Sequence, residues 1–373
     1  MFMKNQTHIK DFNIHNIVTI RAVSEKISDL ENISKKFNAF EGTFEDEPDI
    51  TIHFHQNFDT PGLIFIGLNN SAFNEKGFYV LSNGRDEIKA RIPFTELGDK
   101  CTIDCQSDDE VPLLNYIINL RILKKNFIPL HASAFRYSGK TAVVMGWAKG
   151  GKTETLLAFA NHGSEFIGDE SLLISADGNQ IFSLPSQVTI WKWQFKEIPD
   201  LLPKIPFQKK FLFFFVMLMD FIYKSAEKTG LKNFFLFRLI KEGLPAFKRQ
   251  LFIRERPQDL FEGRIVKGAV KPDRLILILS HNSEEITVSN CEPSEISERM
   301  LNSNLYEFSY LLKFYDEFRY AFPGKNNDFI DNLRAHYTTL MKRAFGNIKS
   351  YKVLHPYPVS FEKLYDQMKI IFN

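Results

Sequence analysis

The stretch Gly146-Trp147-Ala148-Lys149-Gly150-Gly151-Lys152-Thr153 decides the fold of this chain. It follows a short apolar segment, 141–145, which we expect to be a strand. It precedes a helix-like segment that ends near Gly163, because glycine commonly terminates helices. The spacing GxxxxGK[ST] is typical of a phosphate-binding loop, the P-loop. Its glycines let backbone N–H groups converge on phosphate oxygens, and the helix that follows presents its positive end to the same anion.

The same motif predicts which side chains contact a nucleotide. Lys152 is expected to reach the β- and γ-phosphates, and the Thr153 hydroxyl to ligate Mg²⁺. ATP and Mg²⁺ are therefore the expected cofactors. The alternative is a chance glycine turn before a capped helix, which the strand–loop–helix context disfavours. The predicted nucleotide-binding residues are Gly146, Lys149, Gly150, Gly151, Lys152, Thr153 and Glu154.

Composition excludes several other classes of protein. The 373 residues are 44% hydrophobic and 25% charged, which is ordinary for a globular protein. A net charge of +2, without a long basic tail, gives no reason to expect nucleic acid as a partner. Three cysteines are too few for a disulfide framework or a four-ligand zinc site, and they favour a cytoplasmic location. The N-terminal residues have no apolar run, so we expect no secretory signal.

The most apolar stretch is Phe211–Met219, FLFFFVMLM. It is far shorter than the roughly 20 residues that a membrane-spanning helix needs, so no transmembrane segment is expected. We predict that it is a buried helix. Contact with a membrane surface is the alternative.

The order of segments predicts an α/β fold with two domains. Residues 1–110 are expected to form a β-rich N-terminal domain, with strands near 17–23, 49–54, 62–68, 77–81 and 90–94 and a helix near 26–37. Residues 111–373 are expected to form the P-loop domain, starting with a helix over 112–125. An aromatic and basic block, about 197–258, interrupts that domain as a helical insertion, and helices follow from 294 onward.

Motifs beside the glycine stretch resemble the HPr kinase/phosphorylase family. They are His131-Ala132-Ser133-Ala134, then Glu154-Thr155 after the loop, then Gly163-Ser164-Glu165-Phe166-Ile167-Gly168-Asp169-Glu170. The resemblance covers about residues 127–184 and extends weakly to 264–279. It implies the α/β core that this family shares with phosphoenolpyruvate carboxykinase. Neither the first hundred residues nor the 197–258 block is similar to that family.

The resemblance also implies roles for individual residues. His131 would stand near the transferring phosphate, while Asp169 and Glu170 would hold Mg²⁺ and activate the acceptor hydroxyl. Glu170 replaces the usual second Asp, which moves that carboxylate outward by one methylene. Arg264 and Lys267 are weaker candidates for binding an anionic substrate; a solvated basic face is the alternative for them. An exposed turn is the alternative for the acidic pair, and a buried structural histidine is the alternative for His131.

Phosphoryl transfer requires a metal, positive charge on the phosphates and a carboxylate that orients the nucleophile. An acidic pair that follows a strand, just after the P-loop helix, can supply the carboxylate. The expected function is an ATP- and Mg²⁺-dependent kinase that phosphorylates a hydroxyl of a peptide, a protein serine or a small metabolite. The alternative is a nucleotide-binding regulatory or assembly protein with slow or no ATP hydrolysis. A carboxykinase-like enzyme is a third reading, but it needs further metal-binding His and Lys residues that the sequence does not present. Homo-oligomerisation is left open.

Overall fold

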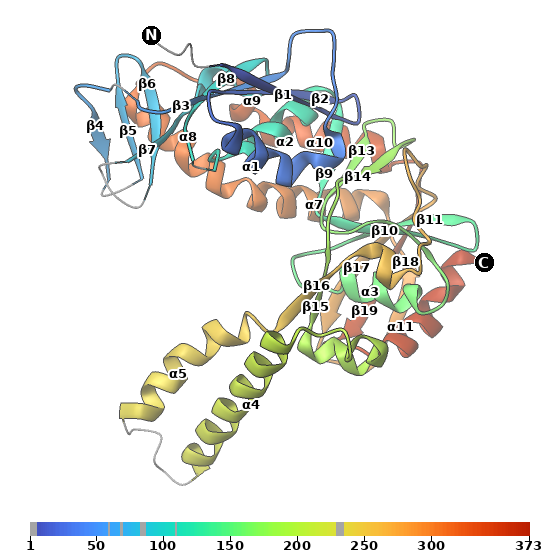
Figure 1. Cartoon of the computed structure of the whole chain (residues 1–373). Helices are drawn as coiled ribbons and strands as arrows, with labels where there is room; N and C mark the ends of the chain where they lie inside the picture. The colour runs from blue at the N-terminus through green and yellow to red at the C-terminus, as the bar shows by residue number, and fades with distance from the viewer. Residues whose placement is uncertain (1–5, 59, 68–69, 83–86, 109, 229–234) are drawn as a thin grey trace.

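The chain is a mixed α/β protein with two lobes and a projecting helical hairpin, seen in a computed structural model (Figure 1). The structure describes residues 6–58, 60–67, 70–82, 87–108, 110–228 and 235–373. One lobe is built on a sheet of N-terminal strands. The second contains the glycine-rich stretch. The α/β class predicted from the sequence is confirmed at this level.

An eight-stranded sheet forms the base of the N-terminal lobe, in the order β1-β2-β3-β8-β7-β6-β5-β4. Strand β3 pairs in parallel with both β2 and β8, and the other pairs are antiparallel. Strict alternation of buried and half-buried residues along β2 shows that one face of the sheet is buried. The strands are β1 (His8–Ile14), β2 (Val18–Ser24), β3 (Ile50–His55), β4 (Ile64–Ile66), β5 (Ser71–Asn74), β6 (Gly77–Leu81), β7 (Ile88–Arg91) and β8 (Cys101–Gln106).

Two of the expected strands differ from the structure at their ends. The strand predicted over 90–94 ends at Arg91, and Phe94 starts a single 3₁₀ turn, Phe94–Glu96, after Pro93. Proline lacks the N–H that a ladder needs, which explains the early end. The strand predicted over 62–68 is reduced to β4, and Leu68 lies outside the described residues.

Helices from both ends of the chain cover this sheet. Asn327 shows how closely the C-terminal part joins it, because its Nδ2 donates to the Phe94 and Leu97 carbonyl oxygens at 2.7 and 2.8 Å. The lobe therefore combines segments from before residue 125 and after residue 292, whereas the predicted division at residue 110 stays a prediction. The helices are α1 (Ile27–Phe37), α2 (Leu114–Lys124), α7 (Pro293–Glu307), α8 (Ser309–Ala321), α9 (Asp328–Asp331) and α10 (Leu333–Phe345).

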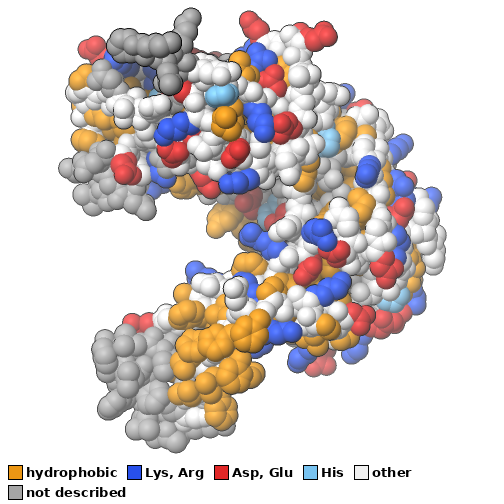
Figure 2. All heavy atoms as spheres, in the orientation of Figure 1, with side chains coloured by type: hydrophobic (Ala, Val, Ile, Leu, Met, Phe, Trp, Pro, Cys, Tyr) orange, Lys and Arg blue, Asp and Glu red, His pale blue; other side chains and the backbone are white. Residues whose placement is uncertain are grey.

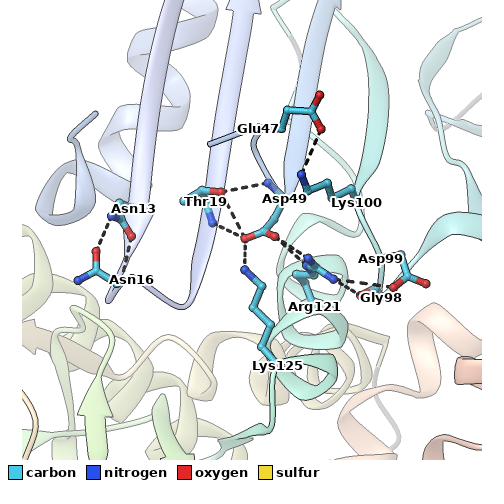
Figure 3. A network of polar contacts seen from close by, with 10 residues as sticks. All are labelled: Asn13, Asn16, Thr19, Glu47, Asp49, Gly98, Asp99, Lys100, Arg121 and Lys125. Atoms are coloured by element: carbon cyan, nitrogen blue, oxygen red, sulfur yellow. Dashed lines mark hydrogen bonds and ion pairs between the residues drawn. The ribbon is translucent and has the colours of Figure 1, made fainter. Parts of the chain in front are cut away.

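A buried carboxylate joins helix α2 to this sheet (Figure 3). Asp49 accepts hydrogen bonds from the Arg121 guanidinium at 2.7 Å, from Lys125 at 2.6 Å and from the Thr19 N–H at 2.9 Å. Burial acts to raise the pKa of Asp49, but the bonds from Lys125, Thr19 and Arg121 outweigh it, so the pKa is lowered. Asp49 is therefore a paired anion in the folded protein.

The second lobe is built on a six-stranded sheet, ordered β12-β10-β11-β17-β19-β18. Its centre, β11-β17-β19, is parallel, and the flanking pairs are antiparallel. Helices α3 (Lys152–Ala160) and α11 (Phe361–Met368) pack together on one face, and the His162 ring stacks on Tyr365 at 3.4 Å. The strands are β10 (Ala132–Tyr137), β11 (Lys140–Met145), β12 (Glu165–Gly168), β17 (Arg274–His281), β18 (Thr287–Asn290) and β19 (Lys349–Pro356).

A small three-stranded sheet, β14-β13-β9, links the lobes. Its strands are β9 (Phe127–Leu130), β13 (Leu172–Ser175) and β14 (Ile181–Ser183). The apolar run 127–135 therefore contributes to two sheets. The chain passes from β9 to β10 at His131, so this side chain lies where the two sheets meet.

The block over 197–258 leaves the second lobe through a ribbon of β15 (Val188–Trp191) and β16 (Phe252–Glu255), which pair antiparallel. Helices α4 (Phe207–Lys228) and α5 (Phe235–Lys248) extend from this ribbon as a hairpin away from both lobes (Figure 1). The prediction that 211–219 is a buried helix was wrong. Only Phe213 and Val216 are buried among its nine residues, because the hairpin has no core on its outer side. In the described part of the chain, no helix is long and apolar enough to cross a membrane.

Candidate functional site

The site begins at the end of β11, where the glycine loop (Gly146–Gly151) turns the chain into α3. Lys149 and Gly151 take left-handed backbone conformations, with φ of 62° and 111°. A Cβ on Gly151 would overlap Nε2 of the buried His355, which lies 2.9 Å from the Gly150 carbonyl oxygen. The loop is therefore held tightly against β19, and position 151 requires glycine.

Lys152, the first residue of α3, lies across this loop. Its Nζ donates to the carbonyl oxygens of Gly146 at 3.1 Å and Trp147 at 3.0 Å, and the residue is only 5% exposed. Burial lowers the pKa of Lys152, against the opposing effect of the Glu170 and Asp169 carboxylates. The ammonium group is thus positioned at the centre of the loop, where an anion's oxygens could replace the two carbonyls.

Asp169 follows β12 and lies beneath the start of α3. Its carboxylate accepts a hydrogen bond from Ser133 Oγ at 2.6 Å and from Thr153 Oγ1 at 3.2 Å. Burial raises the pKa of Asp169 to about 6. The structure therefore brings together three residues that are 16 to 36 positions apart in sequence.

His131 is held between two carboxylates. Its Nε2 is 3.2 Å from Glu170 Oε2 and its Nδ1 is 3.1 Å from Glu307 Oε1. The hydrogen bond with Glu170 raises the pKa of His131 despite burial, and the same bond lowers the pKa of Glu170. Glu307 was not predicted, because it comes from the last turn of α7 and no local pattern marks it.

Glu154 lies in the first turn of α3, beside the loop. It is only 7% exposed, burial raises its pKa, and the amide of Gln194 donates to its Oε1 at 2.9 Å. The Gln194 contact joins α3 to the segment that leads towards the hairpin. The described contacts therefore favour a positioning role for Glu154.

Several of these residues line a cleft of about 440 Å³. One wall carries the predicted His131, Lys149, Gly151, Lys152, Thr153, Glu154 and Glu170. The other carries aromatic side chains and a cation that sequence reasoning missed: Trp191, Trp193, Phe252, Tyr357 and Arg254. Trp191 and Phe252 are opposite each other in the β15–β16 ribbon, and Lys149 Nζ lies 5.5 Å from the Trp191 ring centroid. In the sequence, the short apolar segments before and after the two helices could have indicated that β15 and β16 pair.

A second cavity, of about 300 Å³, adjoins the first. His131 and Glu170 line both cavities. The remaining walls come from α2, the small sheet, α7 and α10, and no Lys or Arg is among the described residues that line it. Tyr337 is also part of the lining, and its fully buried hydroxyl has no hydrogen-bond partner in the described part of the chain.

Two predicted residues lie elsewhere. The Arg264 guanidinium donates to the carbonyl oxygens of Ser164 at 3.1 Å and Ala160 at 3.3 Å, so it caps the C-terminal end of α3. The glycine loop is at the opposite end of this nine-residue helix. Lys267 is exposed and does not line the cleft.

The donor set at the cleft restricts which metals it could hold. Among the described residues, no group of three or more His, Cys, Asp or Glu side chains is arranged to bind a metal ion. Mg²⁺ differs from Zn²⁺ in this respect, because it is usually held by one or two carboxylates together with water and substrate phosphates. The adjacent Thr153 hydroxyl and Asp169 carboxylate fit that requirement. Comparison with family models and with the sequences of curated proteins gave no match to this chain.

Proposed function

We propose that the chain binds Mg²⁺-ATP in the cleft and transfers the γ-phosphoryl group to a hydroxyl in the second cavity. The observation that carries this proposal is the position of His131 and Glu170, which line both cavities. A transferring group must pass between two bound molecules, and these side chains lie where the two would meet. The predicted HPr-kinase-like P-loop core is part of the same proposal.

The cleft offers separate surfaces for the parts of a nucleotide. The glycine loop and Lys152 suit the phosphates, since backbone N–H groups at a helix start and a buried ammonium favour anions. Trp191 and Phe252 suit a planar base, which stacks on aromatic faces. Lys149 lies beside Trp191, between these two regions.

Thr153 and Asp169 would hold Mg²⁺ against the phosphates. When bound, the ion would neutralise charge on the phosphate oxygens. Ser133 fixes the Asp169 carboxylate from its other side, so this ligand is oriented before metal binds.

Glu170 and His131 have charges suited to the transfer itself. The lowered pKa of Glu170 keeps it an anion, which can accept the proton of an acceptor hydroxyl. The raised pKa of His131 favours the imidazolium, which stabilises the negative charge on the moving phosphoryl group. As the acceptor oxygen bonds to phosphorus, the bond between the γ-phosphorus and the β–γ bridging oxygen breaks and ADP leaves.

The lining of the second cavity limits the acceptor. Carboxylates and amides contribute to it, in particular Glu307, Asn115 and Asn119, and His131 is the one basic side chain among its described lining residues. An anionic acceptor would be repelled here. A neutral or cationic molecule with a hydroxyl group, such as a serine-containing peptide or a sugar, fits this charge pattern.

The test is transfer of label from γ-³²P-ATP to a panel of serine peptides and small alcohols. The wild-type protein should label at least one acceptor, while Asp169→Asn should bind ATP and remain folded but transfer at least a hundredfold more slowly. Asp366→Asn changes an exposed carboxylate on α11 and should behave like the wild type. Equal transfer by Asp169→Asn would exclude this mechanism. Tight ATP binding without transfer to any acceptor would favour the regulatory nucleotide-binding alternative.

A further inference from the structure

Helix α4 exposes a continuous apolar stripe on its outer face. Phe207, Phe211, Phe214, Leu218 and Phe221 are three or four residues apart, so they lie on one side of the helix. Their exposed fractions are 83, 64, 57, 39 and 68%. Phe215 and Met217, 37 and 54% exposed, widen the stripe on either side.

The opposite face of α4 already has its packing partners. Phe213 and Val216 are 7 and 2% exposed, and the Phe213 ring lies 6.1 Å from that of Phe195 in the second lobe. A surface helix normally pairs one apolar face with one polar face. Helix α4 buries Phe213 and Val216 on its inner side, where Asp220 and Lys224 also lie, and is apolar along its outer side as well; Figure 2 shows a broad hydrophobic surface on the hairpin. Patches of this kind on globular proteins mark contact with another molecule or a membrane.

The charge of this segment is unlike that of the rest of the chain. Residues 204–256 contain twelve Lys and Arg and four Asp and Glu, a surplus of eight positive charges. Since the whole chain carries +2, the remainder carries −6. Lys204, Lys210 and Arg249 are exposed near the N-terminal end of α4, where Lys209 Nζ lies 3.4 Å from the Gln250 carbonyl oxygen. Asp220 is already paired with Lys224 at 2.8 Å and Lys248 at 2.6 Å, so it does not offset these cations.

The geometry points to one occupant, a membrane surface rich in anionic headgroups. We propose that the outer face of α4 inserts into the interface of such a bilayer, with its Phe side chains at the acyl boundary and its Lys and Arg side chains at the lipid phosphates. The hairpin projects away from both lobes (Figure 1), and the side chains of the stripe are exposed on it. Because no helix in the described residues is suited to cross a bilayer, the helix would lie in the interface.

Charge complementarity favours the membrane over a second copy of the chain. A twofold pairing would place the same patch against itself and therefore bring two positive segments together. Anionic lipids instead meet the surplus charge with the opposite sign. This inference is independent of the kinase proposal, because none of the stripe residues lines the cleft.

The test is co-sedimentation of the full chain with vesicles of phosphatidylcholine alone, or of phosphatidylcholine mixed with phosphatidylglycerol. We expect binding to the mixed vesicles that weakens as salt is raised, and at least tenfold weaker binding to phosphatidylcholine alone. The triple variant Phe211→Ser, Phe214→Ser and Phe221→Ser should lose at least tenfold in affinity for the mixed vesicles. Its removed side chains are exposed, so the fold should persist, which circular dichroism checks.

The matched control changes three other exposed apolar residues, Ile27→Ser, Tyr320→Ser and Ile370→Ser, which are 55, 75 and 57% exposed. It should bind the mixed vesicles as the wild type does. Changing Lys204, Lys210 and Arg249 to Gln should weaken binding and reduce its salt dependence. The proposal is overturned if the wild type binds neither kind of vesicle, or if the Phe triple variant binds as well as its control. It is also overturned if analytical ultracentrifugation shows that the same Phe residues hold a dimer that does not bind vesicles.

Discussion

Replacing Gly151 by alanine should disrupt the glycine loop in a way that the structure quantifies. At φ of 111° an alanine loses about 1–2 kcal/mol relative to glycine. The new Cβ would also overlap His355 Nε2 and lie 2.9 Å from its Cε1, so the ring or the loop must move. Such overpacking costs about 1–3 kcal/mol. The expected total is therefore about 3 kcal/mol in the free energy of unfolding.

Gly163→Ala is the matched control, because Gly163 has φ of 82° but nothing within 4 Å of its new Cβ. Urea unfolding should show a loss of only about 1–2 kcal/mol for this variant. In a His355→Ala background, the cost of Gly151→Ala should fall towards this value, since the overlap with the ring is gone and only the 3.1 Å contact with Ile278 Cγ1 remains. Gly151→Ala should also weaken ATP binding at least tenfold, and Gly163→Ala should not. Equal effects of the two glycine variants on stability and on ATP binding would refute this account of the loop.

Two further outcomes follow from other contacts. Asp49→Asn leaves Arg121 and Lys125 without their buried anion and should cost about 3 kcal/mol in unfolding free energy. Because the pKa of Asp49 is lowered on folding, its contribution should be complete above the ordinary value of 3.8 and should disappear as the pH falls below it. The difference between wild type and variant in urea unfolding should therefore shrink at acidic pH, and a constant difference would contradict the ion-pair account. Arg264→Ala removes a cap at the end of α3 and should lower stability by about 1 kcal/mol without changing ATP affinity; a selective loss of affinity would instead restore the predicted substrate role.

Sequence patterns predicted those parts of the site whose residues are contiguous in the chain. The glycine loop and Lys152 are encoded within eight consecutive residues, and the adjoining strand and helix lie where they were expected. The acidic pair Asp169-Glu170 follows a strand, as predicted. These features depend on backbone conformation and short spacing, which sequence patterns record well.

The remaining parts depend on contacts between distant segments. Glu307 reaches His131 across 176 positions, and Gln194 reaches Glu154 across 40. No periodicity marks such pairs, because each residue alone is typical of an ordinary helix or turn. The burial of 211–219 was mispredicted for a related reason: apolar sequence normally forms a core, and only the folded hairpin reveals that α4 has no core on its outer side.

The central claim is that the cleft beside the glycine loop binds Mg²⁺-ATP. Isothermal titration with Mg²⁺-ATP tests it most directly, using the wild type, Lys152→Ala and, as a control, Lys267→Ala. Lys267 is exposed and outside the cleft, so its loss should leave the affinity unchanged. Lys152→Ala removes the ammonium group at the centre of the loop and should weaken binding at least tenfold. No binding by the wild type, or equal binding by all three proteins, would contradict the claim.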